Sequence, residues 1–412
     1  MSVENSQHVG THSRGMTLAL TSLGHFINDG TTYLVPVVAD FLSLSYHASP
    51  LWVTAMLTLY YAASSITSMA VGRFADRSGK HGSLMAQGML LMSLGLIGYY
   101  AAIKAVPNYL LLPLTLASSV VIGFGSSFYH PIGATMLSQS FGERNKGRAL
   151  GINGAMGSLG RALYPSLYFA VAALLTKPGS IAFFGLVGMA VAACIYQNFR
   201  EERRRASPRV RRSLSLRGAL TRGIVVLTVI SFIRSAAIQA VVSWIPIYFT
   251  YDKALGFSAT LGVAITIMYA AGIVGQPSFG LFVERFDKRY VIAASFLGTS
   301  LALLGYLYTS GTISYLLLFA FGFSTFSGFP VFLSLATDYS PPQYSTFGNS
   351  LVWGLGITGG GTIGPIIPTL ISRGNYARLP YAFEILAIVN LAVTAGLLLL
   401  PRSSQSAKQN AS

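Results

Sequence analysis

Twelve apolar stretches run along this chain of 412 residues, and each is long enough to cross a lipid bilayer. A membrane-spanning helix needs about 20 predominantly apolar residues. The predicted spans cover residues 16–42, 50–74, 83–104, 109–138, 148–175, 179–199, 223–250, 258–283, 290–309, 313–336, 347–372 and 378–400. Only 10% of the residues are charged, whereas an average soluble domain has about 25%. The strict alternation of membrane β-strands is absent, so the sequence predicts an all-α membrane protein with twelve transmembrane helices.

A polar, basic segment at 200–222 separates the spans into two groups of six. The expected parts are a tail (1–15), a six-helix half (16–199), the linker (200–222), a second six-helix half (223–400) and a second tail (401–412). The composition of the linker permits both an amphipathic segment on the membrane surface and a disordered connection.

The two halves repeat one another at three places. GRFADRSGKH at 72–81 corresponds to GLFVERFDKR at 280–289, GFGSSFYHP at 123–131 to GFSTFSGFP at 322–330, and GAMGSLGRALYP at 154–165 to GLGITGGGTIGP at 354–365. The matching spans keep their order and orientation, which indicates a parallel duplication. Repeats of this kind place a binding site between the halves, near the middle of the membrane.

Basic residues are concentrated in the predicted loops. The chain has 28 Lys and Arg against 12 Asp and Glu, a net charge of +16. If the N-terminus is cytoplasmic, most of the basic residues lie in cytoplasmic loops, as the positive-inside rule requires. We therefore expect a multi-pass protein of the cell membrane with both termini in the cytoplasm and no nucleic-acid partner. A second, weaker interpretation of the excess of basic residues is contact with anionic membrane lipids.

The segment GRFADRSGKH resembles the G-x-x-x-D-[RK]-x-G-[RK]-[RK] signature of the major facilitator superfamily. Twelve spans, a six-plus-six duplication and a central basic loop agree with this resemblance. It implies secondary active transport by alternating access, without enzymatic activity, and a conformational latch at the cytoplasmic surface. The alternative reading of the loop is an ordinary hydrated basic turn. The expected latch residues are Gly72, Asp76, Arg77, Gly79 and Lys80, with a partial echo at Glu284 and Arg285.

Two further motifs, GHFIND at 24–29 and FYHP at 128–131, resemble the fosmidomycin-resistance group of drug exporters. The chain departs from that group at two positions. Ile132 stands where the group has an acidic residue, and Arg161 replaces a small or neutral one. Both changes make the predicted cavity more positive. The resemblance implies drug export coupled to protons.

Polar residues form one stripe on the first span, because they are spaced three and four residues apart. Asp29 is the decisive member, since a charge at the bilayer centre costs at least about 2.5 to 3.5 kcal/mol. We predict that Asp29 carries a coupling proton, and that His25, one turn earlier, shares the proton or hydrogen-bonds the carboxylate. A satisfied core histidine is the alternative for His25. The neighbouring Asn28 is expected to contact substrate.

Two polar residues stand at positions where the repeat has no equivalent. His130 corresponds to Phe329 and Arg161 to Gly361, whereas Pro131 and its counterpart Pro330 predict a helix kink that frees backbone groups in both halves. Polar residues that differ between symmetric halves are candidates for substrate contact.

The seventh span adds Arg234 and Gln239 to the predicted substrate site. In the membrane interior two arginines stand against one aspartate, Asp29, while Asp40 and Glu384 lie nearer the outer ends of their spans. If these two acids do not change the sum, a surplus of positive charge is left that an anionic ligand would offset. The alternative for Arg161 and for Arg234 is a structural ion pair with Asp29.

The predicted function is proton-coupled export of an anionic or amphipathic small molecule by a monomer that needs no cofactor. Proton-coupled or passive uptake of an organic anion is the first alternative. A membrane sensor without transport activity is the second. No metal site is expected, because no His and Cys spacing typical of one occurs.

Overall fold

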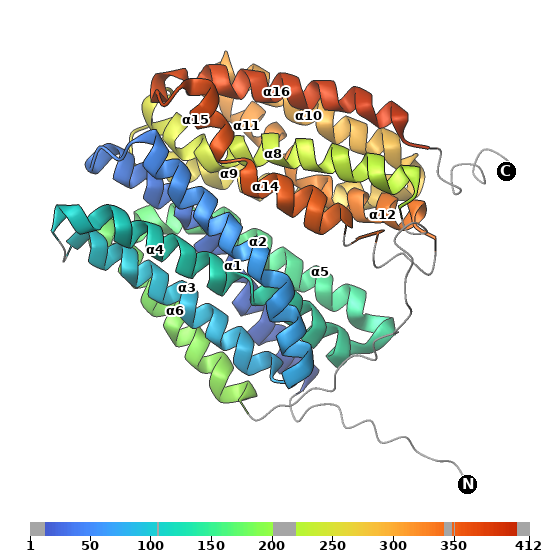
Figure 1. Cartoon of the computed structure of the whole chain (residues 1–412), viewed down its shortest axis with the longest axis horizontal. Coiled ribbons are helices and arrows are strands. Elements are labelled where there is room, and N and C mark those ends of the chain that lie inside the picture. The colour runs from blue at the N-terminus through green and yellow to red at the C-terminus, as the bar shows by residue number, and fades with distance from the viewer. Residues whose placement is uncertain (1–12, 105–106, 201–219, 342–347, 350, 402–412) are drawn as a thin grey trace, which may run out of the picture. The chain divides into compact units, whose positions relative to one another are not determined.

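A computed structural model of the chain describes residues 13–104, 107–200, 220–341, 348–349 and 351–401 (Figure 1). All regular structure within these ranges is helical, and no strand occurs in them. The predicted all-α class is therefore confirmed. Most of both tails and most of the 200–222 linker lie outside the described residues, so their predicted character stays a prediction.

The helices follow the predicted spans closely. Those of the first half are α1 (Arg14–Ser45), α2 (Pro50–Ser78), α3 (His81–Lys104), α4 (Asn108–Ser126), α5 (Tyr129–Leu174) and α6 (Lys177–Phe199). Those of the second half are α8 (Arg222–Tyr251), α9 (Ala259–Arg285), α10 (Lys288–Leu307), α11 (Gly311–Ser327), α12 (Phe329–Tyr339), η2 (Leu351–Gly359), α14 (Gly360–Ile363), α15 (Ile366–Ser372), η3 (Tyr376–Arg378), α16 (Leu379–Gly396) and η4 (Leu397–Leu399).

Eight stretches of the described chain are long and apolar enough to cross a membrane. The predicted first, second, fifth and tenth spans are not among them, and correspond to α1, α2, the later part of α5, and α11 with α12. The first and fifth spans carry polar site residues, and α11 is short because the tenth span is broken. The number of twelve spans therefore stays a prediction.

Helix breaks precede the two repeated prolines. The helix α4 ends at Ser126 and α5 begins at Tyr129, while α11 ends at Ser327 and α12 begins at Phe329. A proline has no N–H to donate to the carbonyl four residues earlier, so the helix is interrupted just before it. In both halves a short interruption of the helix thus lies at the predicted kink.

The chain divides into two compact units. Unit 1 contains Met1–Tyr33, Ala62–Tyr164 and Ala170–Arg209, and unit 2 contains Leu34–Tyr61, Pro165–Phe169 and Val210–Ser412. Within unit 1, α3 packs on α4 and α6. Within unit 2, α9 and α10 pack on α11, and α8 packs on η2, α14 and α16. The predicted division at the linker stays a prediction.

One element has no counterpart in the sequence-based prediction. The segment η2, Leu351–Gly359, is a π-helix, whereas the equivalent part of α5 in the first half is α-helical. Ser235 of α8 donates a hydrogen bond to the Ile357 carbonyl of η2 at 2.6 Å. The π-helix is rare and occurs mostly as short bulges, often at functional sites.

Candidate functional site

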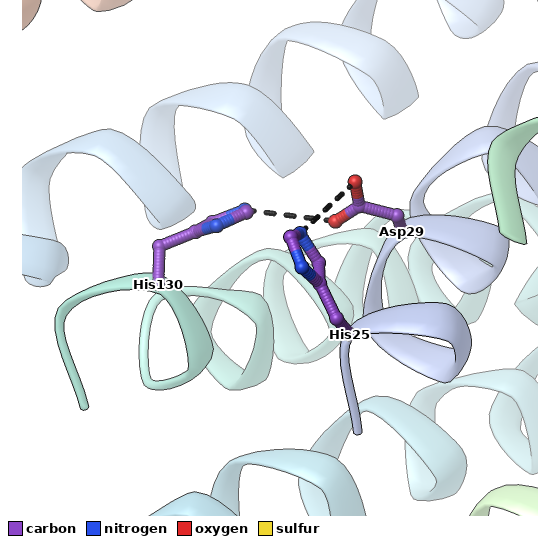
Figure 2. A group of neighbouring side chains, drawn as sticks. All are labelled: His25, Asp29 and His130. Atoms are coloured by element: carbon purple, nitrogen blue, oxygen red, sulfur yellow. Dashed lines mark ion pairs between the residues drawn. The ribbon is translucent and has the colours of Figure 1, made fainter. Parts of the chain in front are cut away.

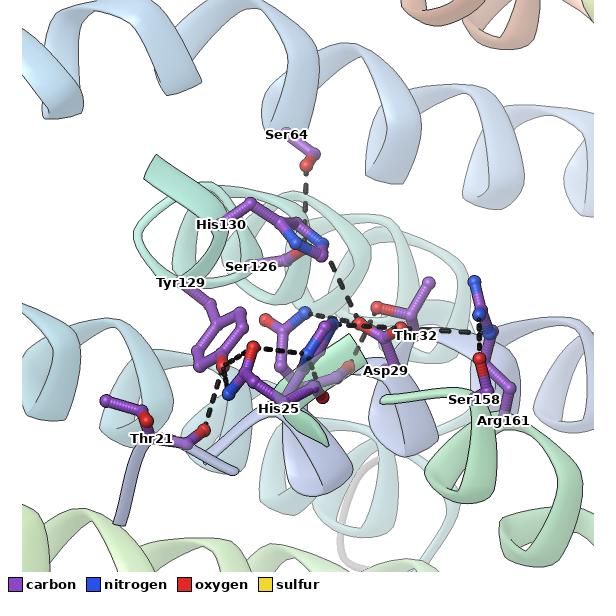
Figure 3. Close-up of polar contacts among 12 residues, drawn as sticks. Thr21, His25, Asp29, Thr32, Ser64, Ser126, Tyr129, His130, Ser158 and Arg161 are labelled. Atoms are coloured by element: carbon purple, nitrogen blue, oxygen red, sulfur yellow. Dashed lines mark hydrogen bonds and ion pairs between the residues drawn. The ribbon is translucent and has the colours of Figure 1, made fainter. Parts of the chain in front are cut away.

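One buried carboxylate, that of Asp29 on α1, is surrounded by basic side chains in unit 1 (Figure 3). His25 Nε2 lies 3.4 Å from Asp29 Oδ2, and His130 Nε2 lies 3.6 Å from Oδ1. Arg161 Nε lies 3.8 Å from Oδ2. The structure therefore brings three of the predicted site residues together around the Asp29 carboxylate.

Local structure explains how two helices supply these groups. His25 and Asp29 are four residues apart, so α1 places them on the same face. His130 is the second residue of α5, directly after the break that follows α4. Arg161 lies farther along α5, beyond Gly142, whose φ of 65° and ψ of 177° interrupt the helix. The break at Gly142 separates the helical segments that carry His130 and Arg161.

Two glycines let α5 approach α1 closely. A Cβ atom at Gly157 would lie 2.4 Å from His25 Nε2, and one at Gly160 would lie 2.2 Å from the Phe26 carbonyl oxygen. A side chain at Gly160 would therefore clash with backbone atoms, whereas one at Gly157 would require the His25 ring to move. At Gly151 and Gly154, by contrast, a Cβ would meet no described atom within 4 Å.

The ring of His25 is held by a network behind the carboxylate. Its Nδ1 lies 2.8 Å from the Asn153 carbonyl oxygen and 2.9 Å from Asn153 Oδ1. Asn153 in turn donates to the Tyr129 hydroxyl at 2.8 Å, and that hydroxyl donates to the Thr21 carbonyl at 2.8 Å. A carbonyl oxygen can only accept, so the proton of a neutral His25 is on Nδ1.

This tautomer has a consequence at the other ring nitrogen. In neutral His25 the Nε2 lone pair points at a carboxylate oxygen of Asp29, only 3.4 Å away. Two acceptors at this distance repel one another unless a proton or another cation lies between them. The geometry therefore defines a cation position between His25 and Asp29.

The remaining members of the predicted set differ in exposure. Asn28 is 1% exposed, and its amide donates to Asp29 Oδ1 at 3.0 Å. The His130 side chain is 58% exposed. Arg161 is less exposed and donates to Ser158 Oγ at 2.7 Å. Asn28 thus supports the carboxylate, whereas His130 and Arg161 are accessible to a ligand.

Arg234 belongs to unit 2 and is buried there. Its guanidinium carbon lies 4.6 Å from the centre of the Phe296 ring, and Nη2 donates to the Thr325 carbonyl at 3.2 Å and to Ser295 Oγ at 3.4 Å. Its Nε has no hydrogen-bond partner among the described residues. These contacts place the guanidinium inside the helix packing of unit 2, and its predicted role in substrate binding stays a prediction.

Gln239 also lies in unit 2. Its Nε2 donates to the Tyr61 hydroxyl at 2.5 Å and to Ser243 Oγ at 2.8 Å. Both hydrogens of the amide are therefore engaged with protein groups. Substrate contact by Gln239 would have to replace one of these bonds, and it stays a prediction.

The predicted latch residues lie around the ends of α2 and α9. Gly79 ends α2 with a left-handed φ of 69°, and a Cβ at Gly72 would lie 3.5 Å from Pro131 Cβ. The side chains of Arg77, Lys80, Glu284 and Arg285 are exposed, and that of Asp76 lies outside the described structure. In the second-half loop, ion pairs of 2.7 Å join Lys288 to Asp338 and Arg289 to Asp287. The latch function stays a prediction.

Sequence reasoning missed Asn153, Tyr129 and Ser158. The spacing of Asn153, Gly157 and Arg161 contained a signal, because residues four apart share one face of a helix. Asn153 is a polar residue on the same α5 stripe as Arg161, and it could have been included with it.

Comparisons with known proteins agree with this architecture. The model of the Major Facilitator Superfamily matches residues 21–353 and 259–412. An uncharacterized MFS-type transporter of Bacillus subtilis (strain 168), YfnC, is 22% identical over 371 residues, which cover 86% of this chain and 88% of YfnC. A second such transporter of the same organism, YfiU, is 24% identical over 183 residues, which cover 44% of this chain and 33% of YfiU.

Solved transporter structures share the fold. A bacterial homolog of the human lysosomal transporter Spinster, inward-facing and occupied, has a TM-score of 0.72 and 13% identity, and the match covers 95% of this chain and 96% of that one. A POT family transporter in complex with 5-aminolevulinic acid has a TM-score of 0.73 and 14% identity, with 94% and 96% covered. At such identities the similarity shows the fold alone.

Proposed function

Since the chain belongs to the major facilitator superfamily and is therefore a multi-pass membrane transporter and not an enzyme, we propose that it couples the movement of an anionic small molecule to protons. The observation that supports this proposal is the buried Asp29 carboxylate, contacted by His25, His130 and Arg161.

Asp29 is the proposed proton carrier. Its carboxylate is buried, and it faces a ring nitrogen of His25 that carries a lone pair when the imidazole is neutral. A proton placed between these two groups removes the repulsion between them. A carboxyl group that accepts or releases a proton when the charges beside it change is suited to coupling proton movement to substrate movement. His25 shares the proton, and Asn28 and Asn153 hold the two groups in place.

Arg161 is the proposed anion contact. A guanidinium stays charged in any protein setting, and that of Arg161 pairs with Asp29 Oδ2 at 3.8 Å. When Asp29 is protonated, Arg161 loses this counter-ion. A carboxylate, phosphonate or phosphate of the substrate then replaces it, and two parallel hydrogen bonds from the guanidinium give the contact its geometry. The exposed His130 is a second group within reach of such a ligand.

The sign of the coupling follows from this exchange of counter-ions. Protonation of Asp29 frees Arg161, so the proton and an anionic substrate favour each other and bind together. Binding together produces symport, which an inward proton gradient turns into uptake. Export by exchange requires the proton and the substrate to compete. The geometry around Asp29 therefore favours proton-coupled uptake of an organic anion over the export of an anion.

Export remains the second candidate for one class of substrate. The motifs GHFIND and FYHP resemble the fosmidomycin-resistance exporters. A cationic amphipathic molecule would compete with the proton for Asp29, and competition gives exchange. The charge of the substrate thus decides between the two candidates.

The deciding experiment measures proton movement driven by a substrate gradient. Organic acids and amines that raise the melting temperature of the purified protein are the test substrates. Proteoliposomes are loaded with one of them and with a pH-sensitive dye, and the membrane potential is clamped with potassium and valinomycin. Efflux of an acid by symport makes the lumen alkaline, whereas exchange makes it acidic. Substrate flux without any proton movement would contradict the coupling.

A further inference from the structure

We propose that His25, Asp29 and His130 form a binding site for one divalent transition-metal ion of the Zn²⁺ or Co²⁺ class. One ligand atom from each residue, two imidazole nitrogens and a carboxylate oxygen, lies within 4.8 Å of the other two. Figure 2 shows both rings, one from α1 and one from α5, directed toward the Asp29 carboxylate. The inference does not depend on the proposed transport, because metal binding is an equilibrium property of the folded protein.

The distances fit a tetrahedral site after a small adjustment. Ligand atoms about 2.0 to 2.2 Å from a tetrahedral metal are about 3.3 to 3.6 Å from one another. His25 Nε2 lies 3.4 Å from Asp29 Oδ2 and His130 Nε2 lies 3.6 Å from Oδ1, so the two imidazoles contact different oxygens of the carboxylate. Coordination through one of these oxygens requires an imidazole to move closer to it, and His130 has an exposed side chain that is able to turn.

The surroundings of His25 are those of a metal ligand. A histidine that binds a metal almost always donates its other ring N–H to a carbonyl or carboxylate. His25 Nδ1 makes this bond to the Asn153 carbonyl oxygen at 2.8 Å, which leaves the Nε2 lone pair directed at the site. Asn28 donates to Asp29 Oδ1 at 3.0 Å and fixes the third ligand in the same way.

The donor set selects the class of ion. Two imidazoles and one carboxylate suit Zn²⁺, Co²⁺ and related ions, whereas Mg²⁺ requires octahedral oxygen ligands. His130, 58% exposed, gives an ion access and leaves room for a water or a substrate group at the fourth position.

The positive charge of Arg161 opposes binding of the metal ion. Its Nε lies 3.8 Å from Asp29 Oδ2, so its positive charge repels a dication bound to the same carboxylate. Removal of this charge should therefore strengthen metal binding, whereas removal of a ligand should weaken it. A gain of affinity cannot result from misfolding, so this variant tests the site even if a ligand variant folds poorly.

The test is a titration of the purified full chain, without a histidine tag, with Co²⁺ followed by its visible absorption, and displacement by Zn²⁺. We expect one Co²⁺ per chain with a tetrahedral spectrum, and no effect of Mg²⁺. Asp29→Asn and His130→Gln should each weaken binding by about tenfold or more, since even outer-shell changes cost 10- to 100-fold. Arg161→Gln should tighten binding by about tenfold.

The matched control is His47→Asn. His47 is exposed and has a φ of 52°, a conformation that asparagine tolerates. This variant should leave the titration unchanged. The proposal is overturned if wild type binds no stoichiometric Co²⁺, or if binding persists at full strength in both Asp29→Asn and His130→Gln. Loss of metal binding with intact proton coupling, or the reverse, separates this inference from the proposed function.

Discussion

At the scale of single residues, the charge of Asp29 is the feature that requires explanation. A carboxylate in the middle of a membrane span costs at least about 2.5 to 3.5 kcal/mol. In unit 1 this cost is offset by the ion pair with Arg161, the contacts with His25 and His130, and the hydrogen bond from Asn28. Each contact depends on the protonation of the carboxylate, so a change at Asp29 affects the whole cluster.

The first prediction concerns this carboxylate. Asp29→Asn keeps the size of the side chain but cannot carry the proton, so it should abolish accumulation driven by a proton gradient in proteoliposomes. Substrate exchange without a gradient should be less affected, because exchange does not require the empty carrier to return. Asp252→Asn, at an exposed acid, is the control and should transport normally. Full gradient-driven transport by Asp29→Asn would show that another group couples the proton.

The second prediction separates the two arginines. Arg161→Gln should weaken binding of an acid by about tenfold or more but hardly change that of its methyl ester, because a charged hydrogen bond contributes about 1.5 to 3 kcal/mol. Arg234 packs on Phe296 inside unit 2, so Arg234→Gln should change the affinities of acid and ester equally and lower the melting temperature. The measurement is binding of both ligands to the purified variants. If Arg161→Gln lowered the affinities for acid and ester equally, Arg161 would not be the residue that distinguishes an anionic ligand from a neutral one.

At the scale of elements, the contact between α1 and α5 builds the site. The break before Tyr129 places His130 near the start of α5, and Gly157 and Gly160 bring a later part of the same helix against α1. The equivalent segment of the second half contains the π-helix η2. One duplicated pattern thus produces an α-helical wall for the cluster in unit 1 and a different local structure in unit 2.

The third prediction tests this contact. A Cβ at Gly157 would lie 2.4 Å from His25 Nε2, so Gly157→Ala should displace the ring from Asp29. We expect gradient-driven transport to fall about as much as in His25→Ala, while the protein stays folded. Gly154→Ala is the matched control, because a Cβ there meets no described atom within 4 Å. The measurement is transport relative to the amount of folded protein, and similar rates for the two alanine variants would rule out the steric explanation.

At the scale of the whole molecule, the duplication allows a residue of one half to be compared with the equivalent residue of the other half. Gly72 at the end of α2 corresponds to Gly280 at the end of α9. A Cβ at Gly72 meets Pro131 Cβ at 3.5 Å, whereas one at Gly280 meets no described atom within 4 Å. The repeat is thus preserved in sequence at a pair of positions whose packing differs.

The fourth prediction uses that pair. Gly72→Leu adds bulk against Pro131 at the expected latch, so it should slow conformational cycling and reduce the transport rate. Ligand affinity should change by no more than a few fold, because a Cβ at Gly72 meets Pro131 Cβ and no atom of Asp29, His25 or Arg161 within 4 Å. Gly280→Leu should have a smaller effect on the rate. Binding and initial rates measured on the same preparations decide the matter, and a large loss of affinity at unchanged rate would contradict the latch.

The sequence by itself determined the helical class, the approximate positions of the helices, the repeat and the helix interruptions before Pro131 and Pro330. These features follow from local chemistry, namely the length of apolar runs and the missing N–H of proline. It also placed His25 and Asp29 on one stripe, since the periodicity of a helix fixes which residues share a face.

Only the tertiary structure decided which groups meet that stripe. Helical periodicity does not specify the neighbouring helix, so the contacts of Asp29 with His130 and Arg161 depend on how closely α5 packs at Gly157 and Gly160. The same packing supplies the Asn153 carbonyl that fixes the tautomer of His25. This acceptor could not be predicted from the sequence, because every residue has a backbone carbonyl. Burial of Arg234 among phenylalanines is decided in the same way, by side chains from other helices.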